Sequence, residues 1–270
     1  MIRVTATSLS FVIVCAYSFQ QDIDIKLSNY NSYRCSTNTS LVTNREFKVL
    51  LPTSTYAKSF ADNLCQSKSI ASAYAAVSVN WQSRDSLTAM NILAEKFNLI
   101  WSRDHIMMGL VPEYQTLYRA LFSSTKGSLY WLSQSSQPRL ELSYLKDKTI
   151  GLLKDTKSLS AYLLPLNSLT SLHLNIEELN IVYYDSFEAL FEDFKLKKID
   201  LISGFKWHSH NLGLEQLYYT QISNQYDYGN WYVRQDDYNP SFKHDFYCAF
   251  SAYKKVFMDI ENSQFHQVGC

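Results

Sequence analysis

The chain has 270 residues, with 25 basic and 25 acidic side chains and no net formal charge. Affinity for nucleic-acid phosphates comes from clustered lysine and arginine, so this neutrality argues against a nucleic-acid partner. With 46% hydrophobic residues, the composition is that of a globular protein.

The first 18 residues are typical of a secretory signal peptide. Arg3 precedes an apolar stretch over 9–17, and the triplet 16–18 (AYS) is followed by polar residues. The stretch is shorter than the roughly 20 apolar residues that a membrane span requires. We expect cleavage after Ser18 and export of residues 19–270 to the periplasm. A buried first strand or helix is the alternative.

Four cysteines follow the signal segment, and an even number in an exported chain indicates disulfides. They are Cys35, Cys65, Cys248 and Cys270. Three connectivities are possible. Because the members of each pair lie close together near one end of the chain, we expect Cys35–Cys65 and Cys248–Cys270. No CxxC spacing occurs, so we expect no zinc site.

Strands and helices alternate along the chain from residue 46. Apolar runs and period-two alternation predict strands at 46–52, 75–82, 98–101, 127–134, 149–153, 179–185, 199–204 and 231–234. Helical spacing predicts helices at 57–68, 85–97, 113–122, 159–172, 186–198 and 246–258. Residues 19–45 are polar and irregular. This alternation predicts an α/β fold with largely parallel sheets, and the length favours two lobes.

Hydroxyl groups and a lysine gather where the strand at 149–153 gives way to a helix. Thr156, Lys157, Ser158 and Ser160 surround the expected first turn. That turn has unpaired N–H groups and partial positive charge, so the four side chains suit an oxyanion such as phosphate, phosphonate or carboxylate. A plain helix cap, for which Ser and Thr are preferred, explains them about equally well.

Several short sequence segments occur in the same order as similar segments in a known group of proteins. Residues 145–151 (LKDKTIG) resemble a phrase that opens a second lobe, and 158–162 (SLSAY) resemble a hydroxyl-rich turn facing a cleft. Residues 96–101 (KFNLIW) hold the place of a first-lobe phrase whose glycine and aspartate are replaced, and Ala161 replaces another glycine. Over roughly 46–260 the chain resembles type 2 periplasmic solute-binding proteins, with the phosphate/phosphonate-type ABC-transporter subfamily as the nearest likeness.

The resemblance implies a two-lobed α/β fold in which each lobe is a mostly parallel sheet flanked by helices. It places the first lobe at 19–145, the second lobe at 146–210 and a return to the first lobe at 211–270. It further implies a monomer that traps a small polar ligand, a class that includes anions, by hinge closure and delivers it to a membrane permease.

The turn at 52–56 should then face the cleft from the first lobe. Thr53, Ser54, Thr55 and Tyr56 become candidate ligand contacts, with a helix cap as the alternative.

The remaining candidates each have an ordinary structural explanation. Trp131 ends a strand and could stack on a ligand, although core packing is favoured. Asp185 is a candidate contact at the end of another strand, where capping together with Ser186 also explains it. His208 and His210 would share one face of a strand, yet no third metal ligand has suitable spacing.

A tyrosine-rich stretch at 218–238 includes Tyr226, Tyr228 and Trp231. These rings could line a cleft for a cationic or ring-bearing ligand. A surface layer over the first lobe is the favoured alternative.

Catalytic signals are weak. No GxSxG or HExxH motif occurs, and the closest glycines, Gly204 and Gly213, are too far apart for a nucleotide-binding loop. We therefore expect no enzyme and no cofactor.

Two functions remain. The first is an exported solute-binding protein of the transport type. The second is a periplasmic ligand-sensing subunit that regulates a membrane sensor protein, suggested by the departures at Ala161 and at 96–101 and by the added cysteines.

Overall fold

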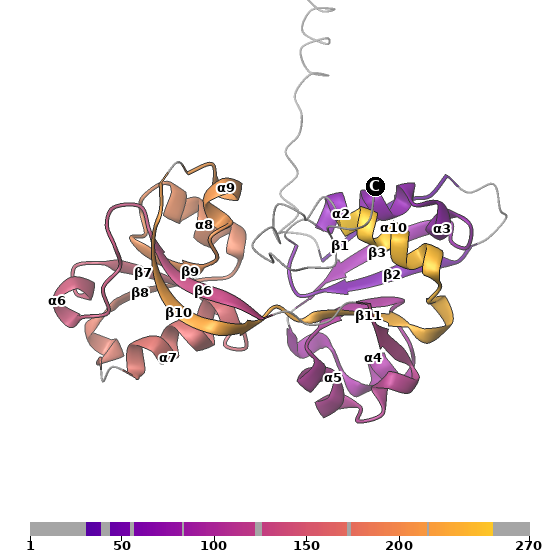
Figure 1. Cartoon of the computed structure of the whole chain (residues 1–270), viewed down its shortest axis with the longest axis horizontal. Coiled ribbons are helices and arrows are strands. Elements are labelled where there is room, and N and C mark those ends of the chain that lie inside the picture. The colour runs from indigo at the N-terminus through magenta and orange to yellow at the C-terminus, as the bar shows by residue number, and fades with distance from the viewer. Residues whose placement is uncertain are drawn as a thin grey trace, which may run out of the picture.

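The computed structural model describes residues 31–38, 44–54, 57–82, 84–121, 126–171, 174–214 and 216–250. Within these ranges the chain forms two lobes, each built on one sheet (Figure 1). In this part of the chain no helix combines the length and apolar character needed to span a membrane. The expected signal peptide at 1–18 lies outside the described residues.

The first lobe contains a six-stranded sheet in the order β1-β3-β2-β4-β11-β5. Its strands are β1 (Ser32–Ser36), β2 (Glu46–Leu51), β3 (Ala76–Trp81), β4 (Leu99–Ser102), β5 (Tyr118–Ala120) and β11 (Asn230–Arg234). The central strands β3, β2 and β4 are parallel, while β1, β11 and β5 pair antiparallel.

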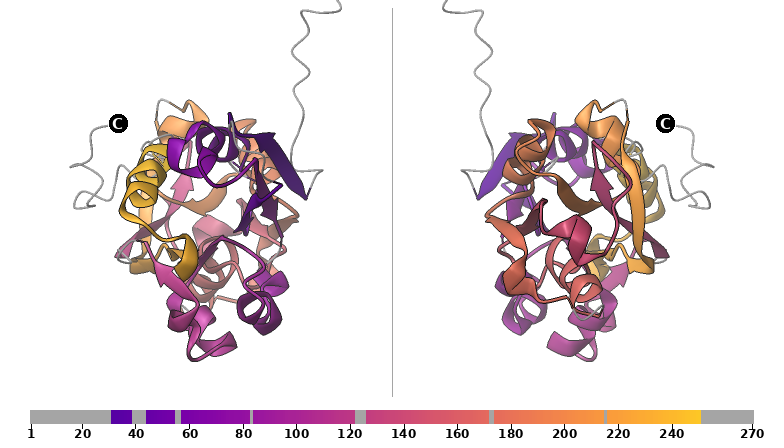
Figure 2. Two further views of the ribbon diagram at one scale, coloured as in Figure 1. Left: turned by 90° about the vertical axis from the view of Figure 1, so that its right-hand side faces the viewer. Right: turned by 90° about the vertical axis from the view of Figure 1, so that its left-hand side faces the viewer.

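Helices cover both faces of this first sheet. On one face lie α2 (Ala57–Gln66), α3 (Lys68–Ala71) and α10 (Pro240–Phe250), and on the other lie α4 (Ala89–Leu93) and α5 (Asp104–Leu110), as Figures 1 and 2 show. Strand β2 is buried on both sides: Phe47 and Val49 pack towards α2 and α10, and Leu50 packs towards α4 and α5. A strand covered on both faces is expected to be continuously apolar, as 49–51 is.

The second lobe contains a five-stranded sheet in the order β10-β6-β9-β7-β8. Its strands are β6 (Lys126–Ser133), β7 (Thr149–Leu153), β8 (Asn180–Tyr184), β9 (Leu201–Gly204) and β10 (Tyr218–Asp227). Its helices are α6 (Leu142–Leu145), α7 (Leu164–Thr170), α8 (Phe187–Lys195) and α9 (His208–Leu212). Strand β7 is parallel to β8 and β9, whereas β6 and β10 are antiparallel.

The expected α/β class is confirmed, but the sheets are not mostly parallel, because β1, β5, β6, β10 and β11 all pair antiparallel with their neighbours. The boundaries between the lobes differ from those expected at 145/146 and 210/211. β6 and β10 both lie in the second sheet, because they pair with each other along most of their length. The second lobe therefore runs from about Lys126 to Asp227.

The direct link from β10 back to β11 is only two residues long, Tyr228 and Gly229. Gly229 has a φ of +85°, and a Cβ atom there would lie 2.8 Å from the carbonyl oxygen of Ser102. Glycine is thus required at this crossing, both for its positive φ and for the close approach of the two backbones.

Three expected elements are wrong. The helix expected at 113–122 is a 3-10 turn followed by β5, because Ala120 pairs with Tyr232 of β11, far along the chain. The histidine segment expected as a strand is α9. The helix expected at 85–97 is limited to α4 and a short 3-10 turn at Arg84–Ser86.

The predicted disulfide Cys35–Cys65 is present and joins β1 to α2. Cys248 is also disulfide-bonded. Because Cys270 lies outside the described residues, the pairing Cys248–Cys270 stays a prediction.

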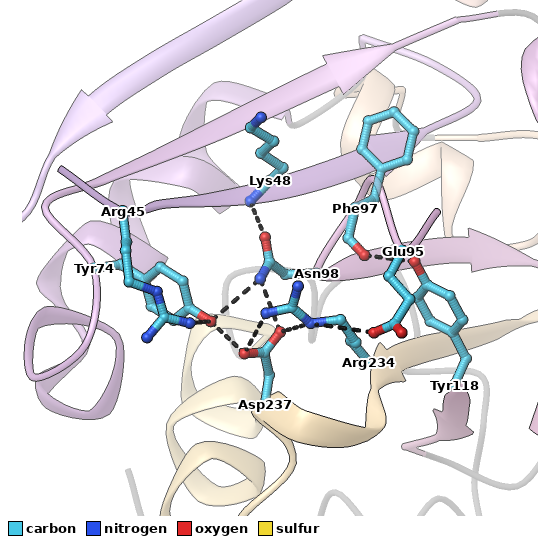
Figure 3. Close-up of polar contacts among 9 residues, drawn as sticks. All are labelled: Arg45, Lys48, Tyr74, Glu95, Phe97, Asn98, Tyr118, Arg234 and Asp237. Carbon is cyan, nitrogen blue, oxygen red and sulfur yellow. Dashed lines mark hydrogen bonds and ion pairs between the residues drawn. The ribbon is translucent and has the colours of Figure 1, made fainter. Parts of the chain in front are cut away.

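A buried polar network connects the segment at the end of β11, through Arg234 and Asp237, to the first sheet (Figure 3). The Asn98 side-chain oxygen accepts a hydrogen bond from the Lys48 N–H at 2.7 Å, and its nitrogen donates to Asp237 at 2.8 Å. Asp237 also accepts from the Tyr74 hydroxyl and lies 2.9 Å from Arg234 Nε. The network sits at the amino ends of β2 and β4, so it leaves their carboxyl ends to the interlobe side.

Candidate functional site

A cavity of about 190 Å³ lies between the two lobes. The first lobe contributes Leu51, Pro52, Thr53, Arg84, Trp101 and Trp231, and the link contributes Tyr228; the second lobe contributes Ser160, Phe187, Phe191, Ser203, Gly204, Phe205, Trp207, His208 and Tyr226. We refer to it as the interlobe cavity.

Strand direction explains why these residues meet. Leu51 ends β2, and Gly204 ends β9, so the carboxyl edges of the two sheets face each other across the cavity. Ligands of open α/β sheets bind at this edge, where strands give way to loops. The interlobe cavity therefore has the position expected of a binding site.

Eight aromatic side chains dominate the lining. Phe205 stacks on Trp207 with ring centroids 5.4 Å apart and 14° between the planes, and Tyr226 meets Phe205 edge-on at 5.0 Å. Tyr228 packs against both Phe205 and Tyr226. These rings form a packed apolar surface suited to a flat ligand.

His208 supports this aromatic surface from inside. Its side chain is buried, and its Nδ1 accepts a hydrogen bond from the Phe205 N–H at 2.9 Å. Burial lowers the pKa of His208 to about 3, so the ring is neutral and carries its proton on Nε2. No cluster of three metal-binding side chains occurs among the described residues.

Two polar side chains bring unpaired groups to the apolar lining. Ser203 is 2% exposed, and its hydroxyl has no hydrogen-bond partner among the described residues. Arg84 forms an ion pair with Asp155, while its Nε has no hydrogen-bond partner in that same part of the chain. Buried polar groups in proteins are nearly always paired, so both atoms are candidates for ligand contact.

A side pocket of about 30 Å³ adjoins the interlobe cavity and shares Leu51, Pro52, Arg84 and Trp101 with it. Arg103 also lines this side pocket and is buried there. Its guanidinium donates to the Tyr226 hydroxyl and to the Asp227 carbonyl, each at 3.3 Å. The side pocket thus lies between two guanidinium groups.

The first-lobe candidates divide between the cavity and its rim. Thr53 lines the interlobe cavity. Ser54 donates a hydrogen bond to Glu188 of the second lobe at 2.9 Å. Thr55 and Tyr56 lie outside the described residues.

The turn at 156–160 brings only one of its four candidates to the cavity, and that residue is Ser160. Thr156 and Lys157 are exposed. Ser158 is buried and accepts a hydrogen bond from the Ala161 N–H at 3.3 Å, as a helix cap does. The geometry of Ser158 therefore fits the capping alternative.

Trp131 and Asp185 do not line the interlobe cavity. Trp131 is buried in the second-lobe core, where its Nε1 donates to Ser168 at 3.0 Å. Asp185 is 82% exposed at its side chain and pairs with Lys154 at 2.9 Å. Both positions fit the structural alternatives considered for them.

The favoured interpretation of the tyrosine-rich stretch needs correction. Tyr226, Tyr228 and Trp231 line the interlobe cavity, since the stretch contains the link between the lobes. Arg84 and Ser203 were missed by the sequence analysis. Both stand at or just beyond the carboxyl end of a predicted strand, which is the one signal that could have found them.

Comparisons with known proteins bear on the fold. No family model matches the sequence, and no curated protein matches it. A solved structure, the binding protein component of an ABC phosphonate transporter from Pseudomonas aeruginosa, matches with 17% identity and a TM-score of 0.50, covering 81% of this chain and 80% of that chain. The substrate binding domain of a putative molybdenum ABC transporter from Clostridium difficile matches with 15% identity and a TM-score of 0.50, covering 79% and 96%.

At these identities the likeness shows the fold. The chain has the two-lobed α/β fold of these two ABC-transporter binding proteins. The resemblance drawn from the order of the sequence phrases is confirmed at that level.

Proposed function

We propose that the protein is an exported solute-binding protein that captures a small molecule in the interlobe cavity by hinge closure. The observation that carries the proposal is the cavity itself, because both lobes and the link between them contribute its walls. Its fold neighbours are binding proteins of ABC transporters, which supports a binding role over catalysis.

The contacts between the lobes favour a hinge mechanism. Besides the link at Tyr228 and Gly229, contacts between the lobes include the Ser54–Glu188 hydrogen bond, the Arg84–Asp155 ion pair and the hydrogen bonds from Arg103 to Tyr226 and Asp227. Such polar side-chain contacts can form and break as rigid lobes move about a short link. A ligand in contact with both lobes would shift the equilibrium towards the closed state.

The test uses the full exported chain with its disulfides intact, refolded after denaturation to release any bound molecule. Small-molecule extract of the expression host is added while thermal unfolding and small-angle scattering are followed. We expect a higher melting temperature and a smaller radius of gyration. A chain that responds in neither measurement would exclude the proposal.

A matched pair of variants locates the response. Thr53→Trp would fill part of the interlobe cavity, whereas Thr156→Trp would add the same side chain at an exposed turn. The first should abolish the shift, and the second should leave it intact. An equal response from both variants would place the binding site elsewhere.

The proposal includes a periplasmic location, a monomeric chain and a membrane permease as partner. The sensory alternative rests on the departures in the sequence and gains no support from the geometry. Affinity capture of membrane proteins on the exported chain separates the two, since recovery of a transporter permease rejects the sensory role.

A further inference from the structure

The interlobe cavity is too apolar for a phosphate-like ligand. Eight of its lining residues are aromatic, and a bare oxyanion would lose hydration without enough donors to replace it. A ring-bearing molecule would instead stack on Phe205 and Trp207 and meet the edges of Tyr226 and Tyr228. The lining thus favours a ligand with a flat apolar body.

The volume of the interlobe cavity restricts the flat apolar part of the ligand to about one or two rings. A cavity of about 150 Å³ in an engineered protein core admits benzene. The interlobe cavity, at about 190 Å³, has room for a ring with a short substituent. Drug-sized ligands occupy sites of about 300–1,000 Å³, so the interlobe cavity favours a smaller molecule.

The charged side chains at the side pocket indicate which substituent the ligand ring carries. Arg84 and Arg103 both line the side pocket, whose described lining includes no carboxylate, and Asp155 pairs with Arg84 from outside that lining. Burial lowers the pKa of Arg84, and the neighbouring Arg103 lowers it further, against the opposing effect of Asp155. A bound anion would relieve this unfavourable environment, whereas a cation would worsen it.

The unpaired atoms match this arrangement. Arg84 Nε faces no acceptor among the described residues, and the Ser203 hydroxyl, on the opposite lobe, likewise lacks a partner in that part of the chain. A ligand with an acidic group and a second polar group could pair both. Each lobe would then contribute one polar contact to a molecule held mainly by aromatic rings.

We propose that the interlobe cavity binds a small aromatic acid. The ring lies against the packed cluster of Phe205, Trp207, Tyr226 and Tyr228, the acidic group meets Arg84 at the side pocket, and a polar ring substituent meets Ser203. This inference rests on the proposed solute-binding function and specifies its ligand class.

The first experiment is calorimetry of the refolded, full exported chain against matched probes. The aromatic acids are phenylacetate, 4-hydroxyphenylacetate and indole-3-acetate, each paired with its neutral amide. Succinate, inorganic phosphate, methylphosphonate and arginine are the competing classes. We expect at least one acid to bind about 10- to 100-fold more tightly than its amide, the range for one charge-assisted hydrogen bond.

The second experiment uses variants. Ser203→Ala should weaken 4-hydroxyphenylacetate about 10-fold, leave phenylacetate nearly unchanged and not lower the melting temperature, because it removes an unpaired hydroxyl. Ser133→Ala is the control: Ser133 is equally buried in the same lobe, has Ser135 as a partner and lies outside the cavity lining. It should leave both affinities unchanged.

Arg84→Gln combined with Asp155→Asn removes the cation without leaving a buried carboxylate unpaired. The double variant should lose the preference for acid over amide while still binding the ring. Retention of that preference would overturn the role of Arg84.

The outcomes separate this inference from the function on which it rests. If phosphate, methylphosphonate, succinate or arginine binds and the aromatic acids do not, the ligand class is wrong and solute binding stands. If neither the probes nor host extract changes the melting temperature, the solute-binding function itself fails. Equal affinity for each acid and its amide also overturns the proposed ligand class.

Discussion

Arg84, just beyond β3 in the first lobe, forms an ion pair with Asp155, which follows β7 in the second lobe. The Arg84 side chain is 12% exposed, so the pair is shielded from solvent on one side. A partly buried pair loses more when one member is removed than an exposed pair does, because the remaining charge stays desolvated. In the proposed hinge closure, this contact would help to set the balance between open and closed lobes.

Asp155→Asn should accordingly favour the open state. The buried guanidinium would gain solvent by separation of the lobes, so the radius of gyration without ligand should rise in small-angle scattering. Asp185→Asn is the matched control, since it removes an exposed ion pair to Lys154 within the second lobe. It should leave the radius unchanged. Identical scattering from wild type and Asp155→Asn would show that the pair does not hold the lobes together.

The stability of the fold should fall at acid pH because of His208. The unfolded imidazole binds a proton near pH 6.5, whereas burial holds the folded pKa near 3. Between these values the unfolded chain binds more protons, so stability is lost as pH falls from about 7 towards 3. The slope contributed by this group approaches about 1.4 kcal/mol per pH unit.

Urea unfolding at a series of pH values tests this expectation. His208→Gln should flatten the dependence below pH 6.5, even if it lowers stability at neutral pH. His105→Gln, at an exposed position of α5, is the matched substitution outside the buried site. An unchanged slope in His208→Gln would rule out His208 as the source.

Ser158 and Ser160 should respond differently to removal of the hydroxyl. Ser158→Ala loses the cap on the Ala161 N–H, so the free energy of unfolding should fall by about 1 kcal/mol with little effect on ligand affinity. Ser160→Ala alters a cavity-lining residue, so its main effect should be on affinity. Chemical unfolding and calorimetry on both variants measure the two effects, and a reversed pattern would contradict the assignment.

Gly229→Ala should destabilise the chain by about 1–3 kcal/mol. Its φ of +85° disfavours a side chain, and the added Cβ would press on the Ser102 carbonyl. Gly109→Ala offers the opposite case: it lies in α5, and a Cβ there meets no atom within 4 Å. Because alanine favours helix, this control should be neutral or stabilising. Equal melting temperatures for both variants would refute the strain at the crossing.

The disulfide Cys35–Cys65 closes a loop with a sequence separation of 30 residues. Loop-closure entropy predicts that the double variant Cys35→Ala/Cys65→Ala loses about 3–4 kcal/mol of unfolding free energy. Denaturant unfolding measures this loss. Mass mapping of the oxidised chain should recover the Cys35–Cys65 peptide pair, and free thiols at both positions would contradict the structure.

The sequence predicted the elements whose signals are local. The apolar run 49–51 and the alternation around Val77 and Val79 correctly indicated β2 and β3. Burial of one or both faces of a strand determines which of its positions are apolar, so the pattern is visible in the sequence. The 113–122 segment failed because strand formation at Tyr118–Ala120 depends on a partner strand more than 100 residues away. Helical spacing alone carries no information about such a partner.

The sequence analysis named some of the cavity-lining residues and missed others. Turn hydroxyls identified Thr53 and Ser160, because strand-to-helix turns are visible in the sequence. Arg84 gave no pattern, and its importance arises from Asp155 and Arg103, which only the fold brings near it. Ser203 looked like an ordinary strand residue until its burial without a partner was seen.

The position of β11 between β4 and β5 has a consequence for biogenesis. The first lobe combines residues from both ends of the chain, and Phe242 and Phe246 of α10 complete its core beside Phe60. The second-lobe sheet, in contrast, is one continuous segment from β6 to β10. A polypeptide emerging amino terminus first would therefore finish its second lobe before its first, whose sheet lacks β11 and whose core lacks α10 until the end of the chain arrives.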